Sequence, residues 1–161
     1  MPVTLLLDRR ALNAALLGGL LAATLDLLYA CSVYAILGVS PLTILQSIAS
    51  GWLGDAAYQG GMATGVLGLL SHFSIVCVTA ILYGVICSRF AVMNLHPVSC
   101  GAAFGTGIFV AMNYVVVPLS ASSVNPPRGW LCVGGLLVHM FLIGVPIALF
   151  ARTAAGPRGK A

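Results

Sequence analysis

Residues 62–87 read MATGVLGLLSHFSIVCVTAILYGVIC, a stretch without any Asp, Glu, Lys or Arg. A helix of this length rises about 39 Å, because each residue adds about 1.5 Å. That distance exceeds the roughly 30 Å thickness of the hydrocarbon core of a bilayer. Backbone amides find no water partner inside hydrocarbon, so a stretch that crosses it must bond its own backbone as a helix. The stretch therefore predicts a membrane-spanning helix that carries one imidazole, His72, near its middle.

The composition of the whole chain is also typical of a membrane protein. Of 161 residues, 60% are hydrophobic and only 6% are charged, whereas soluble domains carry about 25% charged residues. Four apolar stretches are long enough to span a bilayer, and the alternating pattern of a membrane β-barrel is missing. We predict one all-α integral membrane domain over residues 1–161, a four-transmembrane-helix bundle. The predicted helices cover residues 12–37, 62–87, 97–119 and 131–151.

A shorter helix is predicted at residues 41–53, between the first two spanning helices. Ser40 can accept hydrogen bonds from the first turn, and Pro41 suits the first helical position. The predicted polar side comprises Thr43, Gln46, Ser47 and Ser50. The predicted apolar side comprises Leu42, Leu45, Ile48, Ala49 and Trp52. This pattern favours an interfacial helix that lies at the membrane surface or over the mouth of the bundle.

The basic residues predict the orientation of the chain. Six of the seven Lys and Arg residues lie before the first helix, between the second and third, or after the fourth. Only Arg128 lies on the opposite side. Since basic residues collect in cytoplasmic loops, we expect both termini in the cytoplasm. The lipid bilayer is the expected partner, and nucleic acid is not, because no basic stripe with interleaved aromatic residues is present.

Each predicted spanning helix contains a strongly polar side chain near the middle of its apolar stretch. The four residues are Asp26, His72, Asn113 and His139. Such groups are expensive in hydrocarbon, so they normally face a bundle interior or a water-filled cavity. Counted along each helix from its outer end, all four fall in one layer in the outer half of the membrane. They are the candidate residues of a ligand site or proton pathway.

Small residues predict where the helices pack against one another. The glycines expected at helix contacts are Gly19, Gly61, Gly65, Gly68, Gly101, Gly105 and Gly135. Most of them share a helix face with one of the four polar residues, so those residues are expected to point inward. Gly101 and Gly105 are a separate pair on the third helix. We expect this pair to be the better candidate for a homo-oligomer contact.

The polar layer favours a pathway or binding site for protons, an ion or a small solute, or a pH-responsive module. Histidine as a residue type changes its charge near neutral pH. Of the four polar residues, Asp26 is the one whose presence is least explained by hydrogen bonds between helices. A mid-membrane aspartate costs about 3 kcal/mol, whereas an interhelical hydrogen bond in a membrane contributes about 0.6 kcal/mol on average.

Two other functions are compatible with the same residues. The second and fourth helices run in the same direction, so His72 and His139 could ligate one haem b for electron transfer across the membrane. Alternatively, the chain is a structural or subunit-assembly protein without a ligand, and the polar residues hold its helices together.

Enzyme activity is not expected, and no catalytic residues are predicted. No second carboxylate accompanies Asp26 in the polar layer, and no histidine-glutamate metal motif is present. The five cysteines include no Cys-x-x-Cys pair, so neither a metal site nor a disulfide framework is expected. Apart from the haem alternative, the sequence predicts no cofactor.

Three local patterns carry a resemblance to known proteins. They are Gly60-Gly61 leading to His72-Phe73-Ser74, Asn113 before Val117-Pro118-Leu119-Ser120, and His139 before Gly144-Val145-Pro146. In these features the chain resembles small four-helix bacterial inner-membrane proteins of uncharacterised families, and more distantly the YagU type over its last three helices. The resemblance implies a bacterial inner membrane, and for the YagU type a part in acid tolerance.

Overall fold

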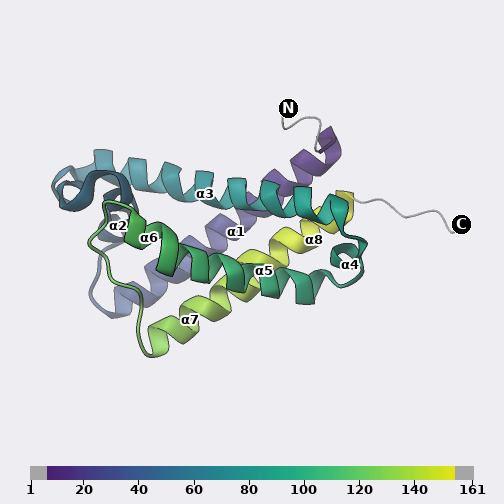
Figure 1. Cartoon of the computed structure of the whole chain (residues 1–161). Coiled ribbons are helices and arrows are strands. Elements are labelled where there is room, and N and C mark those ends of the chain that lie inside the picture. Colours follow the sequence, from purple (N-terminus) through teal and green to yellow (C-terminus); the bar gives the residue numbers. More distant parts are fainter. Residues whose placement is uncertain (1–6, 155–161) are drawn as a thin grey trace, which may run out of the picture.

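The computed structural model describes residues 7–154, and all secondary structure in this range is helical (Figure 1). Two long helices are continuous, namely α1 (Arg9–Ile36) and α3 (Gly61–Arg89). The third consists of α5 (Pro97–Ala111), η3 (Met112–Val116) and α6 (Val117–Leu119). The fourth consists of α7 (Trp130–Val138), η4 (His139–Gly144) and α8 (Val145–Ala154). The short elements are α2 (Pro41–Leu53), η2 (Gly54–Gln59) and α4 (Ala91–Leu95).

Four helices are long and apolar enough to span a membrane, which confirms the all-α class with four such segments. The third runs from Pro97 to Leu119, as predicted. The first begins three residues before the predicted start, because Asp8 caps it and its Oδ1 atom accepts a hydrogen bond from the Ala11 amide at 2.7 Å. Insertion of these helices into a bilayer stays a prediction.

The long helices alternate in direction, so the bundle has two different ends (Figure 1). The first, here called the α2 end, contains α2, η2 and the loop at residues 120–129. The other, here called the terminal end, contains the start of α1, the short helix α4 and the end of α8.

The core is built largely from small side chains that let the helix backbones approach closely. Between α1 and α3, a Cβ atom on Gly19 would lie only 3.0 Å from the Cα atom of Cys77. The buried cluster comprises Ala22, Ala23, Val76, Ala80, Tyr83, Cys87, Ile143, Ile147, Ala148 and Ala151. It extends from the middle of the bundle towards the terminal end. Close packing of this kind leaves few voids as large as a water molecule.

Gly101 and Gly105 are buried within the chain, where α5 crosses η4. A Cβ atom on Gly101 would lie 2.6 Å from the carbonyl oxygen of Gly144, and one on Gly105 would overlap the carbonyl of His139. The prediction that this pair serves a homo-oligomer contact is therefore wrong. The pair already allows two helices of one molecule to touch through their backbones. Whether the chain forms oligomers through another face stays a prediction.

The helix α2 covers the range predicted for it and packs tightly on α3. Gly65 and Gly68 provide the room, since a Cβ atom on Gly68 would overlap the carbonyl of Leu45. Gly61 was also predicted at a helix contact, but the space at its Cβ position is open, and α2 reaches Gly61 only through a hydrogen bond to its carbonyl. Its φ of +55° begins α3 in a conformation that favours glycine.

Both the predicted apolar side and the predicted polar side of α2 contain buried residues. Ala49 of the apolar side is fully buried, Gln46 and Ser50 of the polar side are buried too, and Trp52 is 68% exposed. Gln46 donates to the Gly61 carbonyl at 3.1 Å, and Ser50 shares a hydrogen bond with the hydroxyl of Ser122 at 2.8 Å. The amphipathic pattern gave no signal for the burial of the polar side, which other segments cover and whose hydrogen bonds they satisfy.

Replacing Gly105 by alanine should destabilise the protein, because the added methyl group meets the backbone of η4, which cannot move aside cheaply. We expect a loss of about 1–3 kcal/mol, the usual cost of overpacking. Gly107→Ala is the matched control on the same helix, since nothing lies within 4 Å of its Cβ position. Thermal unfolding in detergent should separate the two variants, and equal stability would contradict the packing described above.

Candidate functional site

All four polar residues singled out in the sequence line one cavity of about 220 Å³, here called the polar chamber. One comes from each long helix, so the chamber lies where the four helices meet. The remaining lining residues are Ile48, Ile75, Val76, Thr79, Ile108, Met112, Val117 and Ile143. The volume is enough for about seven waters, each occupying about 30 Å³. The chamber therefore combines an apolar wall with a few convergent polar groups, the usual character of a binding site.

Asp26 and His72 form the one carboxylate contact with a basic side chain that is found among residues 7–154. The His72 Nε2 atom lies 3.8 Å from Asp26 Oδ2, and the two side chains are 11% and 19% exposed, respectively. The same nitrogen lies 2.9 Å from the carbonyl oxygen of Ala23. A carbonyl oxygen only accepts, so Nε2 must carry a proton and donate it to Ala23. If Nδ1 also carries a proton, the ring is positively charged and its contact with Asp26 is an ion pair. The imidazole thus joins α3 to α1 at the level of the carboxylate.

Asn113 and His139 bond the backbone of their own helices. The Asn113 Nδ2 atom donates to the Phe109 carbonyl at 2.9 Å, and His139 Nδ1 lies 2.8 Å from the Gly135 carbonyl. The ring of Phe109 packs edge-on against the His139 ring, with centroids 5.3 Å apart. A neutral His139 that donates from Nδ1 has Nε2 as its acceptor nitrogen.

Both of these residues lie in π-helical turns. Asn113 is within η3, and His139 is the first residue of η4. Each turn is followed by a proline, Pro118 or Pro146. Proline lacks the amide hydrogen, and its ring crowds the carbonyl four residues earlier, which favours a local widening of the helix. Single π-helical turns are rare and frequently occur at functional sites. The prolines were the only sequence signal for these turns.

A second cavity, of about 420 Å³, opens towards the α2 end and is here called the vestibule. Asp26 and His72 line both the vestibule and the polar chamber, as does Ile48 of α2. The other residues around it are Leu27, Ala30, Tyr34, Val39, Thr43, Ile44, Ser47, Tyr58 and Val124. The ion pair therefore stands at the boundary between two cavities.

A third cavity, of about 640 Å³, lies beside the chamber between α2, η3 and the loop after α6. Its walls include Ile48, Trp52, Met112 and Val117. Most of its lining is apolar, with serine hydroxyls from Ser47, Ser120 and Ser122. The sequence did not predict this side cavity, because it depends on how α2 and the loop fold over the bundle.

Neither metal nor haem is favoured by this geometry. Residues 7–154 contain no group of three or more His, Cys, Asp or Glu side chains that could hold a metal ion. Ordinary ligand pockets have volumes of roughly 300–1,000 Å³, and haem is a large ligand. The chamber that His72 and His139 share has a volume of only about 220 Å³. Iron ligation by Nε2 of His72 would also break its contact with Ala23.

Comparison of the chain with protein-family models, curated proteins and solved structures gave no match. The resemblance to the YagU type therefore stays a prediction.

Purified protein is expected to show no Soret absorption band, because the chamber is too small for the macrocycle. Absorption spectra of the protein from haem-supplemented cells check this. A band that disappears in both His72→Ala and His139→Ala, but persists in His96→Ala, would overturn the expectation and support the haem alternative. His96 is exposed and lies outside the chamber, so it serves as the control.

Proposed function

We propose that the chain is a multi-pass membrane protein that conducts protons through a hydrated path, with Asp26 and His72 as the proton-binding pair. The observation that carries the proposal is the position of this pair, which lines the vestibule and the polar chamber at once. A proton that moves directly between the two cavities passes the residues that both share, namely Asp26, His72 and Ile48.

The chemistry of the pair suits a proton better than a metal cation. One carboxylate and one imidazole 3.8 Å apart can share an added proton in two ways, as carboxylic acid with neutral imidazole or as carboxylate with imidazolium. Hard cations such as Ca²⁺ need six or more oxygen ligands. Asp26 is the only carboxylate that lines the chamber. Intramembrane ionisable groups of this kind commonly form proton relays.

The structural alternative has weaker support. Residues that hold helices together should form hydrogen bonds between helices. The side chains of Asn113 and His139 instead bond the backbone of their own helices. Their remaining polar atoms are thus available to waters in the chamber, and of the four residues only His72 hydrogen-bonds to another helix.

Orientation follows from the basic residues. Arg9, Arg10, Arg89 and Arg152 belong to the terminal end, whereas Arg128 belongs to the loop at the α2 end. Two further basic residues after the fourth helix, Arg158 and Lys160, lie outside the described residues. By the positive-inside rule, the terminal end faces the cytoplasm. The vestibule then opens outward, with α2 at the outer membrane surface, and the resemblance noted above favours the inner membrane of a bacterium.

Asp26→Asn should abolish most proton flux while it preserves the fold, because the amide has nearly the shape of the carboxyl group and cannot carry an added proton. Proton flux is measured in proteoliposomes that enclose a pH-sensitive dye, and a potassium gradient sets the membrane potential that drives it. We expect a decrease of about tenfold or more.

Asp55→Asn is the matched control. Asp55 is exposed in η2, where it accepts a hydrogen bond from Ser123, and it lines none of the cavities described here. The proposal is contradicted if the wild-type protein conducts no faster than empty liposomes, or if the Asp26 variant conducts as fast as the Asp55 variant.

A further inference from the structure

One face of α3 continues from the polar chamber to the terminal end. His72, Thr79, Tyr83 and Cys87 are separated by seven, four and four residues, so they lie on one side of the helix. His72 and Thr79 line the polar chamber. Cys87 lies about 12 Å beyond Thr79 along the axis. Polar groups therefore recur along this face below the chamber.

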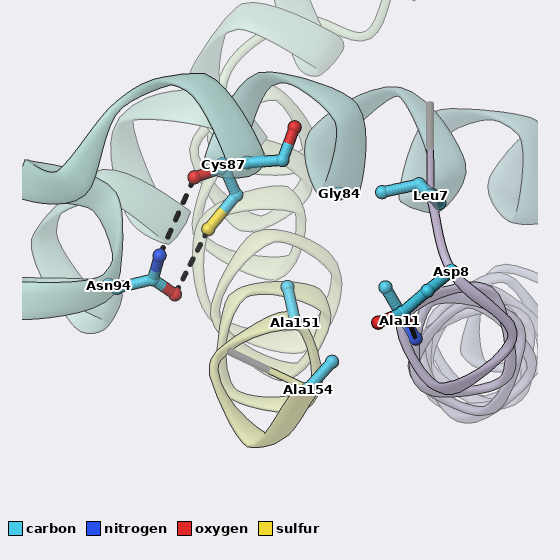
Figure 2. Close-up of a pocket in the computed structure, with 9 residues that line it drawn as sticks. Leu7, Asp8, Ala11, Gly84, Cys87, Asn94, Ala151 and Ala154 are labelled. Atoms are coloured by element: carbon cyan, nitrogen blue, oxygen red, sulfur yellow. Dashed lines mark hydrogen bonds between the residues drawn. The ribbon is translucent and has the colours of Figure 1, made fainter. Parts of the chain in front are cut away.

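Cys87 lines a separate cavity of about 200 Å³ at the terminal end, here called the terminal cavity (Figure 2). Its Sγ atom donates to Asn94 Oδ1 at 3.2 Å, and the two residues lie on one side of the cavity in Figure 2. Asp8, at the start of α1, contributes a carboxylate to the other side. The cavity therefore offers polar groups to water at the end of the bundle opposite to the vestibule.

Between the chamber and the terminal cavity the bundle is closely packed, and Tyr83 lies in this packed region. Its side chain is fully buried, and the ring of Phe104 on α5 packs edge-on against it, with centroids 4.9 Å apart. The Tyr83 hydroxyl is the one buried side-chain oxygen or nitrogen in residues 7–154 that has no hydrogen-bond partner. Buried hydroxyls normally have partners, so an unpaired one calls for an explanation, and a transient water is among the usual ones.

We propose that the Tyr83 hydroxyl passes protons across the packed region, from the polar chamber to the terminal cavity. This inference rests on the proposed function and assigns the inner half of its path. A hydroxyl both donates and accepts, so it can take part in a chain of waters. A hydronium on the chamber side gives its proton to the phenolic oxygen while the original hydroxyl proton leaves to a water on the terminal side. The side chain is chemically unchanged, and its hydroxyl then rotates back.

Tyr83→Phe tests the inference, because it removes the hydroxyl and keeps the ring against Phe104. Flux in proteoliposomes should decrease about 100-fold, within the range that a positioned proton-transfer group contributes. The melting temperature should stay the same or rise, since the variant removes an unpaired buried polar group. A purely structural role for the hydroxyl would instead lower the melting temperature.

Tyr114→Phe is the matched control, since it makes the same chemical change at a side chain that is 55% exposed and outside the cavities. If Tyr83→Phe conducts like the control while Asp26→Asn remains inactive, the inference is overturned and the proposed function survives. If the wild-type protein does not conduct, both are overturned.

A second substitution covers the case in which Tyr83→Phe does not fold. Incorporation of 3-fluorotyrosine at position 83 preserves the shape of the side chain and makes its hydroxyl more acidic. A changed flux supports the inference, and a flux equal to that of the wild-type protein overturns it.

Discussion

A carboxylate inside an apolar bundle needs either a bound proton or a positively charged neighbour, and this requirement governs the centre of the molecule. Asp26 is surrounded by long apolar helices, and its one ion-pairing partner within residues 7–154 is His72, 3.8 Å away. Hydration must supply what this single contact leaves unsatisfied, because a poorly solvated charge is very costly. The vestibule and the polar chamber both reach Asp26, so water can approach the carboxylate from two sides.

Close backbone contacts elsewhere hold the walls of these cavities in place. Gly101 and Gly105 bring α5 against η4, the turn that carries His139. Gly65 and Gly68 likewise bring α2 against α3, and α2 carries Ile48 into the chamber wall. A backbone in contact with another backbone has little freedom to relax. The open centre thus depends on tight crossings around it rather than on loosely packed helices.

The sequence predicted the long helices well because their length and apolar composition are local properties. It also predicted that one polar residue from each long helix belongs to a common layer, since helical spacing relates each of them to nearby small residues. The π-helical turns could not be predicted, because Pro118 and Pro146 indicate a disturbance but not its form. The burial of the polar side of α2 could not be predicted either, since Gln46 and Ser50 find their partners on segments distant in sequence. Gly101 and Gly105 were assigned to the wrong contact, because a small-residue pair does not specify which helix it meets.

Ile48 lines the vestibule, the polar chamber and the large side cavity. One aliphatic side chain therefore borders the two cavities that Asp26 and His72 line and also the side cavity, whose lining is mostly apolar. An apolar compound bound in the side cavity would contact the same isoleucine that borders the two cavities lined by Asp26 and His72. In pharmacological terms, a hydrophobic compound in the side cavity would contact the wall of the polar chamber without occupying the vestibule.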